Sequence, residues 1–294
     1  MTTDAKDSSI ALDPAVQRAW RWLVEGHGRL VLIAATVLFA VIGLGLLVAT
    51  IQANGLGWDY RIYSDRAADF MAGRGFYLPR QLSGPYVVQN GDALYPPPAL
   101  LLFVPFLYLP PFLYWAIPLG ITAAVVIWHR PALWAWPLLA AIPVVNLYLR
   151  FEITKGNPGL WALAFLSLAT VWPFFAPFVA FKWGLAPFAL FGIWRRQWWA
   201  GAAVALVINL AFLPMWLDYV RVVLDARGNT VGYMLGEYPM MLIPLVAWAA
   251  SRRTRRRRVA ADDPDARSVG VDVAEAPDGA SASQSADASA TQTA

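Results

Sequence analysis

Apolar runs alternate with short polar segments along most of the chain, and the length of each run predicts whether its helix can cross a bilayer. An α-helix rises about 1.5 Å per residue, so a hydrocarbon core about 30 Å thick needs about 20 apolar residues. Residues 30–51 form a run of this length. The sequence therefore predicts a first membrane span over residues 30–51.

The later apolar runs are shorter or interrupted. Residues 99–109 cannot cross alone, and Pro110 and Pro111 separate them from residues 112–128, because proline lacks a backbone donor and ends or bends a helix. We predict one broken crossing here, or a re-entrant helix followed by a span. Further apolar runs follow at residues 132–149, 160–171, 174–194, 198–216 and 238–250. Each is expected as a span, unless Lys182 lies at the outer end of a hairpin with short halves.

Composition places the chain among integral membrane proteins. Of its 294 residues, 59% are hydrophobic and only 14% charged, and the mean hydropathy is +0.49, whereas soluble domains are about one quarter charged. We predict an all-α fold, a polytopic membrane helical bundle with a long first outer loop. Residues 1–28 are expected to be a cytoplasmic N-terminal segment, 29–250 the transmembrane domain, and 251–294 a basic, then disordered, cytoplasmic tail.

Basic residues set the predicted orientation, because cytoplasmic loops are enriched in Lys and Arg. The arginine-rich residues 252–258 directly follow the last run, so both termini are expected in the cytoplasm, with residues 52–94 outside a plasma (inner) membrane. If residues 99–128 cross once, residues 150–159 also lie outside; if every run crosses separately, they lie in the cytoplasm. The His129-Arg130 turn favours the first topology.

The residue inventory excludes several kinds of site. The chain has no Cys and only two His, so it offers no thiol nucleophile, no disulfide and no Cys-based metal site. Neither a metal nor another cofactor is expected. The arginine cluster at 252–258 is expected to contact anionic membrane lipid, and nucleic acid is not expected as a partner.

Asp59 is the leading candidate for chemistry. It follows the first run and lies between Trp58 and Tyr60, and a carboxylate partly withdrawn from water has a raised pKa, which suits a general base near neutral pH. The other interpretation is a helix cap or a solvated loop residue. Asp65 and Asp69, four residues apart, are expected to form surface ion pairs instead.

Lys182 is a lone cation within an apolar run, so it needs an anion, a carbonyl or an aqueous cavity, unless it snorkels to the interface. A phosphate group is one suitable partner. Arg150 and Lys155 are weaker candidates for the same role. Tyr95 opens the sequence Tyr95-Pro96-Pro97-Pro98, which is expected to form either a rigid wall or a helix start.

Three segments resemble glycosyltransferase family 87 of the GT-C superfamily, namely Asp59-Tyr60-Arg61-Ile62-Tyr63, Gly73-Arg74-Gly75-Phe76-Tyr77 and Tyr95-Pro96-Pro97-Pro98. The similarity extends more weakly to residues 156–160 and to Lys182 with Pro187. The resemblance implies a GT-C-like membrane enzyme whose first outer loop supplies the catalytic carboxylate, here Asp59. Where the family usually has Gly-Gln-x-Asn, this chain has Gly156-Asn157-Pro158-Gly159, which leaves an inactive relative as an alternative.

The resemblance also implies the reaction, an inverting transfer of a mannose-like or other sugar from a polyprenyl-phosphate donor to an extracytoplasmic glycan or glycolipid acceptor. Asp59 would accept the hydroxyl proton, and Lys182 with Arg150 would offset the charge on the departing phosphate. The side chains expected to contact the substrates are Trp58, Tyr60, Arg61, Tyr63 and Tyr95. The rival interpretation is a non-enzymatic carrier or flippase of lipid-linked sugars, or a scaffold in an envelope complex, because broken helices and buried charges also occur in transporters.

Overall fold

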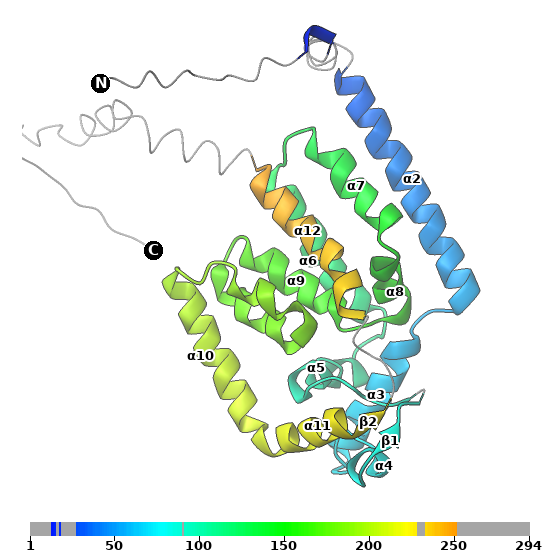
Figure 1. Ribbon diagram of the computed structural model, residues 1–294, viewed down its shortest axis with the longest axis vertical. Helices are drawn as coiled ribbons and strands as arrows, with labels where there is room; N and C mark the ends of the chain where they lie inside the picture. Colours follow the sequence, from blue (N-terminus) through cyan, green and yellow to red (C-terminus); the bar gives the residue numbers. More distant parts are fainter. Residues whose placement is uncertain (1–12, 16–17, 19–27, 90, 228–232, 252–294) are drawn as a thin grey trace, which may run out of the picture. The chain divides into compact units, whose positions relative to one another are not determined.

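The computed structural model of the chain describes residues 13–15, 18, 28–89, 91–227 and 233–251, and nearly all of its regular structure is helical (Figure 1). The predicted all-α character is confirmed. Two short strands, β1 (Tyr86–Val87) and β2 (Ala226–Arg227), pair in parallel and connect two segments far apart in the sequence. Most of residues 1–28 and nearly all of residues 251–294, expected as the N-terminal segment and the tail, lie outside the described residues.

The helical elements are short apart from the first. In chain order they are α2 (Gly28–Asn54), α3 (Trp58–Met71), α4 (Pro79–Leu82), α5 (Pro97–Leu101), η1 (Val104–Leu107), α6 (Leu113–His129), α7 (Ala135–Val145), α8 (Leu147–Lys155), α9 (Gly159–Ala169), η2 (Pro173–Phe181), η3 (Trp183–Leu190), α10 (Arg196–Ala211), α11 (Leu213–Asp225) and α12 (Tyr233–Ala249), where η marks a 3-10 helix.

Helix α2 matches the first predicted span. It has 27 residues, of which only Gly28 and Gly43 are buried, and it packs against α7 and α8. Within the described residues it is the one helix long and apolar enough to cross a membrane by itself. Two bent pairs, α7 with α8 at 69° and α10 with α11 at 80°, would raise the number of candidate spans to 3 if each pair is one span.

Prolines and a polar cap account for the interrupted runs. The predicted break between residues 99–109 and 112–128 is confirmed, since α5 and η1 end before Pro110 and α6 begins at Leu113. The run 132–149 is divided at Asn146, whose side chain accepts hydrogen bonds from the backbone N–H groups of Tyr148 and Leu149 and so caps α8. The run 174–194, expected as a span, does not form one continuous helix.

That run forms η2 and η3 instead. Pro177 and Pro187 lie inside these two elements and remove backbone donors that an α-helix would use. The chain is extended at Lys182, which joins the two elements. The change of direction at this residue brings its side chain inward, where it is only 5% exposed.

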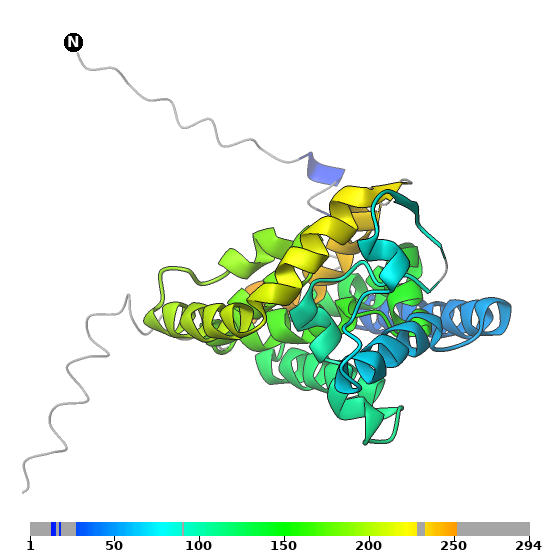
Figure 2. The same cartoon turned by 90° about the horizontal axis from the view of Figure 1, so that it is seen from below.

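The two largest of three clusters of buried side chains form most of the core of the described residues. The first is aromatic and includes Tyr63 on α3, Phe103 between α5 and η1, and Tyr114 on α6. The second joins α9, η2, η3 and α12, with Leu163 and Met240 fully enclosed or nearly so. Helix α11 packs along α4 and α5 at the edge of the aromatic cluster (Figure 2). Burying one such side chain stabilises a fold by about 1.5–3 kcal/mol.

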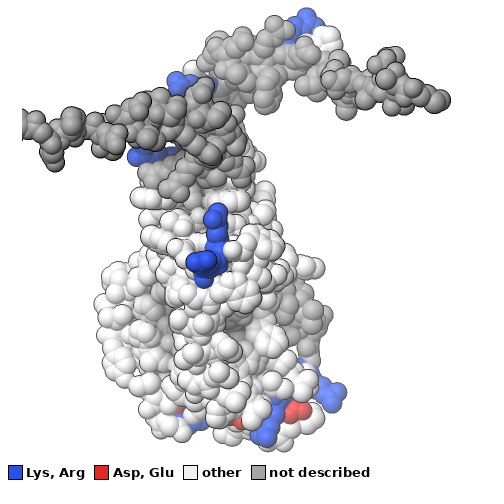
Figure 3. Space-filling model, turned by 90° about the vertical axis from the view of Figure 1, so that its left-hand side faces the viewer, with Lys and Arg blue, Asp and Glu red and all other residues white. Residues whose placement is uncertain are grey.

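Charged side chains are unevenly distributed over the surface. On the face shown in Figure 3, wide areas carry no charge, and the acidic side chains gather at the lower end. In the orientation of Figure 1 this end contains α3, α4 and α11. The polar segment that follows α2 therefore lies at one end of the described residues.

Candidate active site

The candidate site lies where the start of α3 meets the end of α8. Gly57 precedes α3 with φ of 80°, and its backbone N–H donates to the carbonyl of Thr154 at 2.7 Å. Gly156 ends α8 with φ of 70°, and a Cβ atom there would lie 2.6 Å from the Trp115 ring. Both positions require glycine, because the left-handed conformation disfavours other residues. This docking places Asp59, in the first turn of α3, beside residues 156–159.

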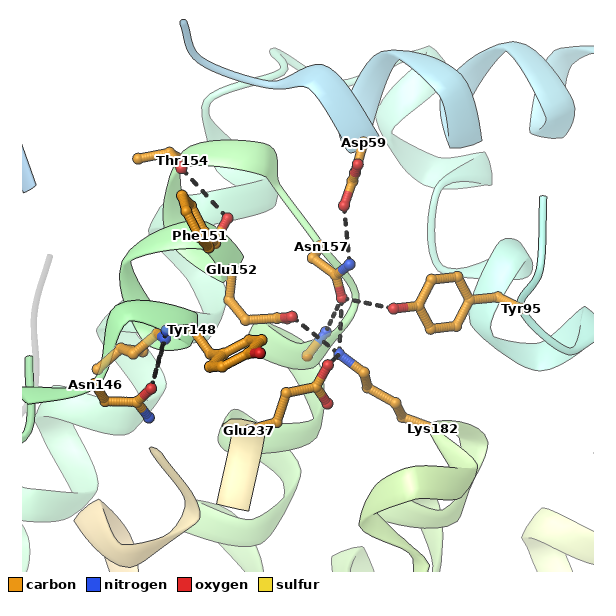
Figure 4. Close-up of polar contacts among 12 residues, drawn as sticks. Asp59, Tyr95, Asn146, Tyr148, Phe151, Glu152, Thr154, Asn157, Lys182 and Glu237 are labelled. Carbon is orange, nitrogen blue, oxygen red and sulfur yellow. Dashed lines mark hydrogen bonds and ion pairs between the residues drawn. The ribbon is translucent and has the colours of Figure 1, made fainter. Parts of the chain in front are cut away.

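Asn157 connects Asp59 to a buried lysine (Figure 4). Its amide nitrogen donates to Asp59 Oδ2 at 2.9 Å. Its Oδ1 accepts from the hydroxyl of Tyr95 at 2.9 Å, from Lys182 Nζ at 2.9 Å and from the backbone N–H of Gly159 at 3.1 Å. One amide thus joins the catalytic candidate, the Tyr-Pro segment and the cation.

Lys182 is held by two glutamates. Its Nζ lies 3.1 Å from Glu152 Oε1 on α8 and 2.9 Å from Glu237 Oε1 on α12, and the three side chains are only 6–7% exposed. An ammonium has three N–H groups, and Glu152, Glu237 and Asn157 take all of them. Lys182 therefore has no remaining donor for a ligand, and both of its ion-pair partners are buried with it.

The close packing of this ion cluster depends on Gly159. A Cβ atom at residue 159 would lie 1.9 Å from Glu152 Oε2 and 2.8 Å from Lys182 Nζ. Neither Glu152 Oε2 nor Glu237 Oε2 has a hydrogen-bond partner among the described residues. The cluster is thus tightly packed but leaves one oxygen of each glutamate without a described partner.

A cavity of about 360 Å³ opens beside these residues. Asp59, Tyr95, Asn157 and Lys182 line it together with Lys155 and both glutamates. A second cavity of about 730 Å³ has an almost wholly apolar lining, including Leu101, Phe165 and Phe181. Trp183 lines both cavities.

Three aromatic side chains lie between the cavities. The ring of Trp183 is 5.7 Å from that of Trp216, which lines the apolar cavity, and 5.9 Å from that of Tyr219, which lines the polar one. Trp216 and Tyr219 also contact each other, with ring centroids 5.5 Å apart. The polar and apolar cavities are therefore neighbours across a thin aromatic wall.

Burial controls the protonation of the groups that line the polar cavity. It raises the pKa of Asp59 above its ordinary value, while the hydrogen bond from Asn157 and the charges of Lys155 and Lys182 act in the opposite direction. Burial also raises the pKa of Tyr95 well above its ordinary value, so its phenol keeps its proton and acts as a donor to Asn157. Asp59 has the character of a base that is easier to protonate than an exposed aspartate.

The structure brings together only some of the predicted site residues. Asp59, Tyr63, Tyr95 and Lys182 line the polar cavity. Trp58, Tyr60 and Arg61 do not line this cavity. Trp58 and Arg61 are exposed. Tyr60 is buried, and its hydroxyl donates to the carbonyl of Phe106 at 3.3 Å.

The expectation that Arg150 faces the phosphate is corrected by its contacts. Its guanidinium donates to the carbonyls of Pro143 and Val144 at 2.7 and 2.6 Å, which satisfies acceptors left free at the end of α7. Arg150 is absent from the lining of the polar cavity. Its role among the described residues is to close a helix terminus.

Sequence reasoning missed three residues of the site. It places Asn157 only in a turn and indicates no role for Glu152 or Glu237. The sequence did contain a signal for the two glutamates, because each lies next to an apolar run and Lys182 needed an anionic partner. Surface ion pairs were expected for Asp65 and Asp69. Asp69 forms them, with Arg66 at 2.9 Å and with Arg74 at 2.6 Å.

Comparisons with protein-family models, with curated proteins and with solved structures find no match to this chain. Across the described ranges, no group of three or more His, Asp or Glu side chains is arranged to hold a metal ion. The geometry of the polar cavity is therefore the main evidence on function.

Proposed function

We propose that this protein is a multi-pass membrane glycosyltransferase that transfers a sugar from a polyprenyl-phosphate donor to an acceptor hydroxyl outside the membrane. The observation that carries the proposal is the position of Asp59, a half-buried carboxylate that lines a polar cavity separated from a larger apolar cavity by Trp183. A lipid-linked donor needs both environments side by side, one for its sugar phosphate and one for its hydrocarbon chain.

Asp59 is suited to the role of general base. Its Oδ2 accepts from Asn157, whereas Oδ1 makes no hydrogen bond to any residue that the structure describes. The acceptor hydroxyl gives its proton to Asp59 as its oxygen attacks the anomeric carbon. The bond from that carbon to the phosphate oxygen breaks on the opposite face, so the products are an inverted glycoside and the polyprenyl phosphate.

Lys155 is the cation that fits the departing phosphate. It is half-buried at the end of α8 and lines the polar cavity, and it forms no ion pair with a described residue. Its charge lowers the pKa of Asp59, which lines the same cavity. Lys182 was the candidate from the sequence, but its three N–H groups are already bonded. We therefore assign the charge-offsetting role to Lys155.

The proposed topology follows the lengths of the helices and the positions of the charges. Helix α2 crosses the membrane once, and the bent pairs and shorter apolar helices complete a bundle. The end that carries α3 and the acidic side chains of Figure 3 faces the outside of the plasma membrane. The arginine-rich segment at 252–258 is cytoplasmic, as its sequence predicts.

The decisive experiment replaces Asp59 by Asn, which keeps the shape and removes the base. Membranes containing wild type or Asp59→Asn are assayed for transfer of radiolabelled sugar from polyprenyl-phosphate donors of several sugars. We expect a loss of about 10²–10⁴-fold, the usual contribution of a general base. Asp65→Asn is the matched control, because Asp65 is exposed on the same helix and does not line the cavity.

Two results would contradict the proposal. Transfer that is equal in wild type and Asp59→Asn, at equal abundance, would exclude Asp59 as the base. Absence of transfer by the wild type with every donor, combined with co-purification of a lipid-linked sugar, would favour the rival carrier function.

A further inference from the structure

We infer that Asn157 is a positioning residue that holds the Asp59 carboxylate so that Oδ1 is the oxygen left to receive the acceptor's proton. The inference rests on the proposed function and extends it to a residue that does not itself react. It follows from the hydrogen bonds on both sides of one amide (Figure 4).

The orientation of the Asn157 amide is fixed by its partners. Tyr95, Lys182 and Gly159 each place an N–H or O–H group at Oδ1, at 2.9, 2.9 and 3.1 Å. In the flipped orientation the amide N–H groups would face these three donors, and the amide oxygen would face a carboxylate. Only one orientation is compatible with all four contacts.

The three donors come from separate parts of the chain. Tyr95 lies before α5, Lys182 lies between η2 and η3, and Gly159 opens α9. The backbone of Asn157 is also constrained, because its N–H donates to the carbonyl of Glu152 at 3.1 Å. The amide thus has little freedom to turn, and its nitrogen presents a fixed donor to α3.

A fixed donor on Oδ2 has two effects on Asp59. It sets the rotation of the carboxylate, so that Oδ1 cannot exchange places with Oδ2 without breaking the bond. It also stabilises the ionised form, which burial disfavours. This hydrogen bond lowers the pKa of Asp59 more than the charge of Lys155 or Lys182 does.

Asn157→Asp tests the inference with a minimal change. The variant keeps an acceptor for Tyr95, Lys182 and Gly159, but replaces the donor that faces Asp59 by an oxygen. As a base, Asp59 works only when ionised, so the rate rises with pH through its pKa. Loss of the donor and the like charge of the new carboxyl both raise that pKa, and we expect the acid limb of the kcat profile to move to higher pH, with kcat lowered at least about tenfold at neutral pH.

Tyr95→Phe is the second variant, for use if Asn157→Asp does not accumulate. It removes one of the three donors on Oδ1 and leaves Asn157 in place, so a smaller shift in the same direction is expected. The other titratable groups around Asp59 are unchanged in both variants: Lys155 and Glu152 on α8, Tyr63 on α3, Lys182, and Glu237 on α12. Asn157→Asp adds one carboxyl beside Asp59, whereas Tyr95→Phe adds no charge.

The outcomes separate this inference from the proposed function. If Asp59→Asn abolishes transfer while Asn157→Asp keeps the wild-type rate and pH profile, Asn157 is not a positioning residue, although the enzyme assignment stands. A uniform fall in kcat with an unchanged acid limb would show a purely structural role and overturn the inference as well. A shifted acid limb with near-normal donor KM is the expected result.

Discussion

Removal of the Lys182 ammonium should destabilise the protein strongly. The cation lies 3.1 Å from Glu152 and 2.9 Å from Glu237, with all three side chains only 6–7% exposed. At an effective dielectric constant of about 20, each attraction at such a distance is about 5 kcal/mol before desolvation is subtracted. Breaking a buried pair by removing one partner typically costs about 3–5 kcal/mol, because it leaves an uncompensated charge. Lys182→Met leaves both buried glutamates without the cation that they share.

The assay is thermal unfolding in detergent, followed through the fluorescence of the fifteen Trp residues. A loss of this size lowers the Tm by roughly 10 °C in a domain of this size. Lys155→Met serves as the control, because Lys155 has no ion pair with a described residue and its loss should change stability by less than about 0.5 kcal/mol.

A rescue variant makes the prediction sharper. Lys182→Met combined with Glu152→Gln and Glu237→Gln removes the cation together with both anions, and we expect it to recover most of the lost Tm, because neutral groups are far less costly to bury. The reasoning is refuted if Lys182→Met is as stable as the wild type. It is equally refuted if the triple variant unfolds no later than the single one.

Two further predictions concern the neighbours of this cluster. Lys155→Met should raise the KM for the polyprenyl-phosphate donor by about tenfold or more while leaving the Tm unchanged, since a charge-assisted contact to phosphate contributes roughly 1.5–3 kcal/mol; an unchanged KM would remove Lys155 from the phosphate site. Gly159→Ala should destabilise by about 1–3 kcal/mol in the same unfolding assay, because its Cβ would lie 1.9 Å from Glu152 Oε2. Gly120→Ala in α6 is the control, with no atom within 4 Å of the added Cβ, so a Tm equally lowered in both variants would argue against the clash.

Local features of the sequence were sufficient for part of this architecture. The length of the first apolar run defined α2, and Pro110 and Pro111 marked the break before α6. The difference at residues 174–194 has a physical cause, because the length and apolar character of a run do not by themselves distinguish one helix from two shorter elements. Pro177 and Pro187 were the available warning.

The part of the site that could be predicted consists of single charged residues near or within apolar runs. Asp59 and Lys182 stood out as charges beside apolar runs, and both line the cavity. Their partners did not, because Asn157 lies 98 residues from Asp59 and 25 from Lys182 in the sequence. Arg150 was misassigned for the opposite reason, since a local need for donors at the end of α7 uses its guanidinium.

The ion cluster raises the question of why charges are buried where apolar side chains could fill the same volume. Replacing a buried ion pair by apolar or neutral groups of similar size is often neutral or stabilising, so stability alone is a weak reason for the cluster. Here the ammonium also donates to Asn157 Oδ1 and thereby helps to aim the opposite end of that amide at Asp59. If positioning is the reason, the rescued triple variant should be stable but slow. Its acid limb does not decide the question, because loss of the Lys182 charge by itself raises the pKa of Asp59. If the triple variant is both stable and fully active, the cluster has no part in orienting Asn157, and Tyr95 with the Gly159 backbone is sufficient for that purpose.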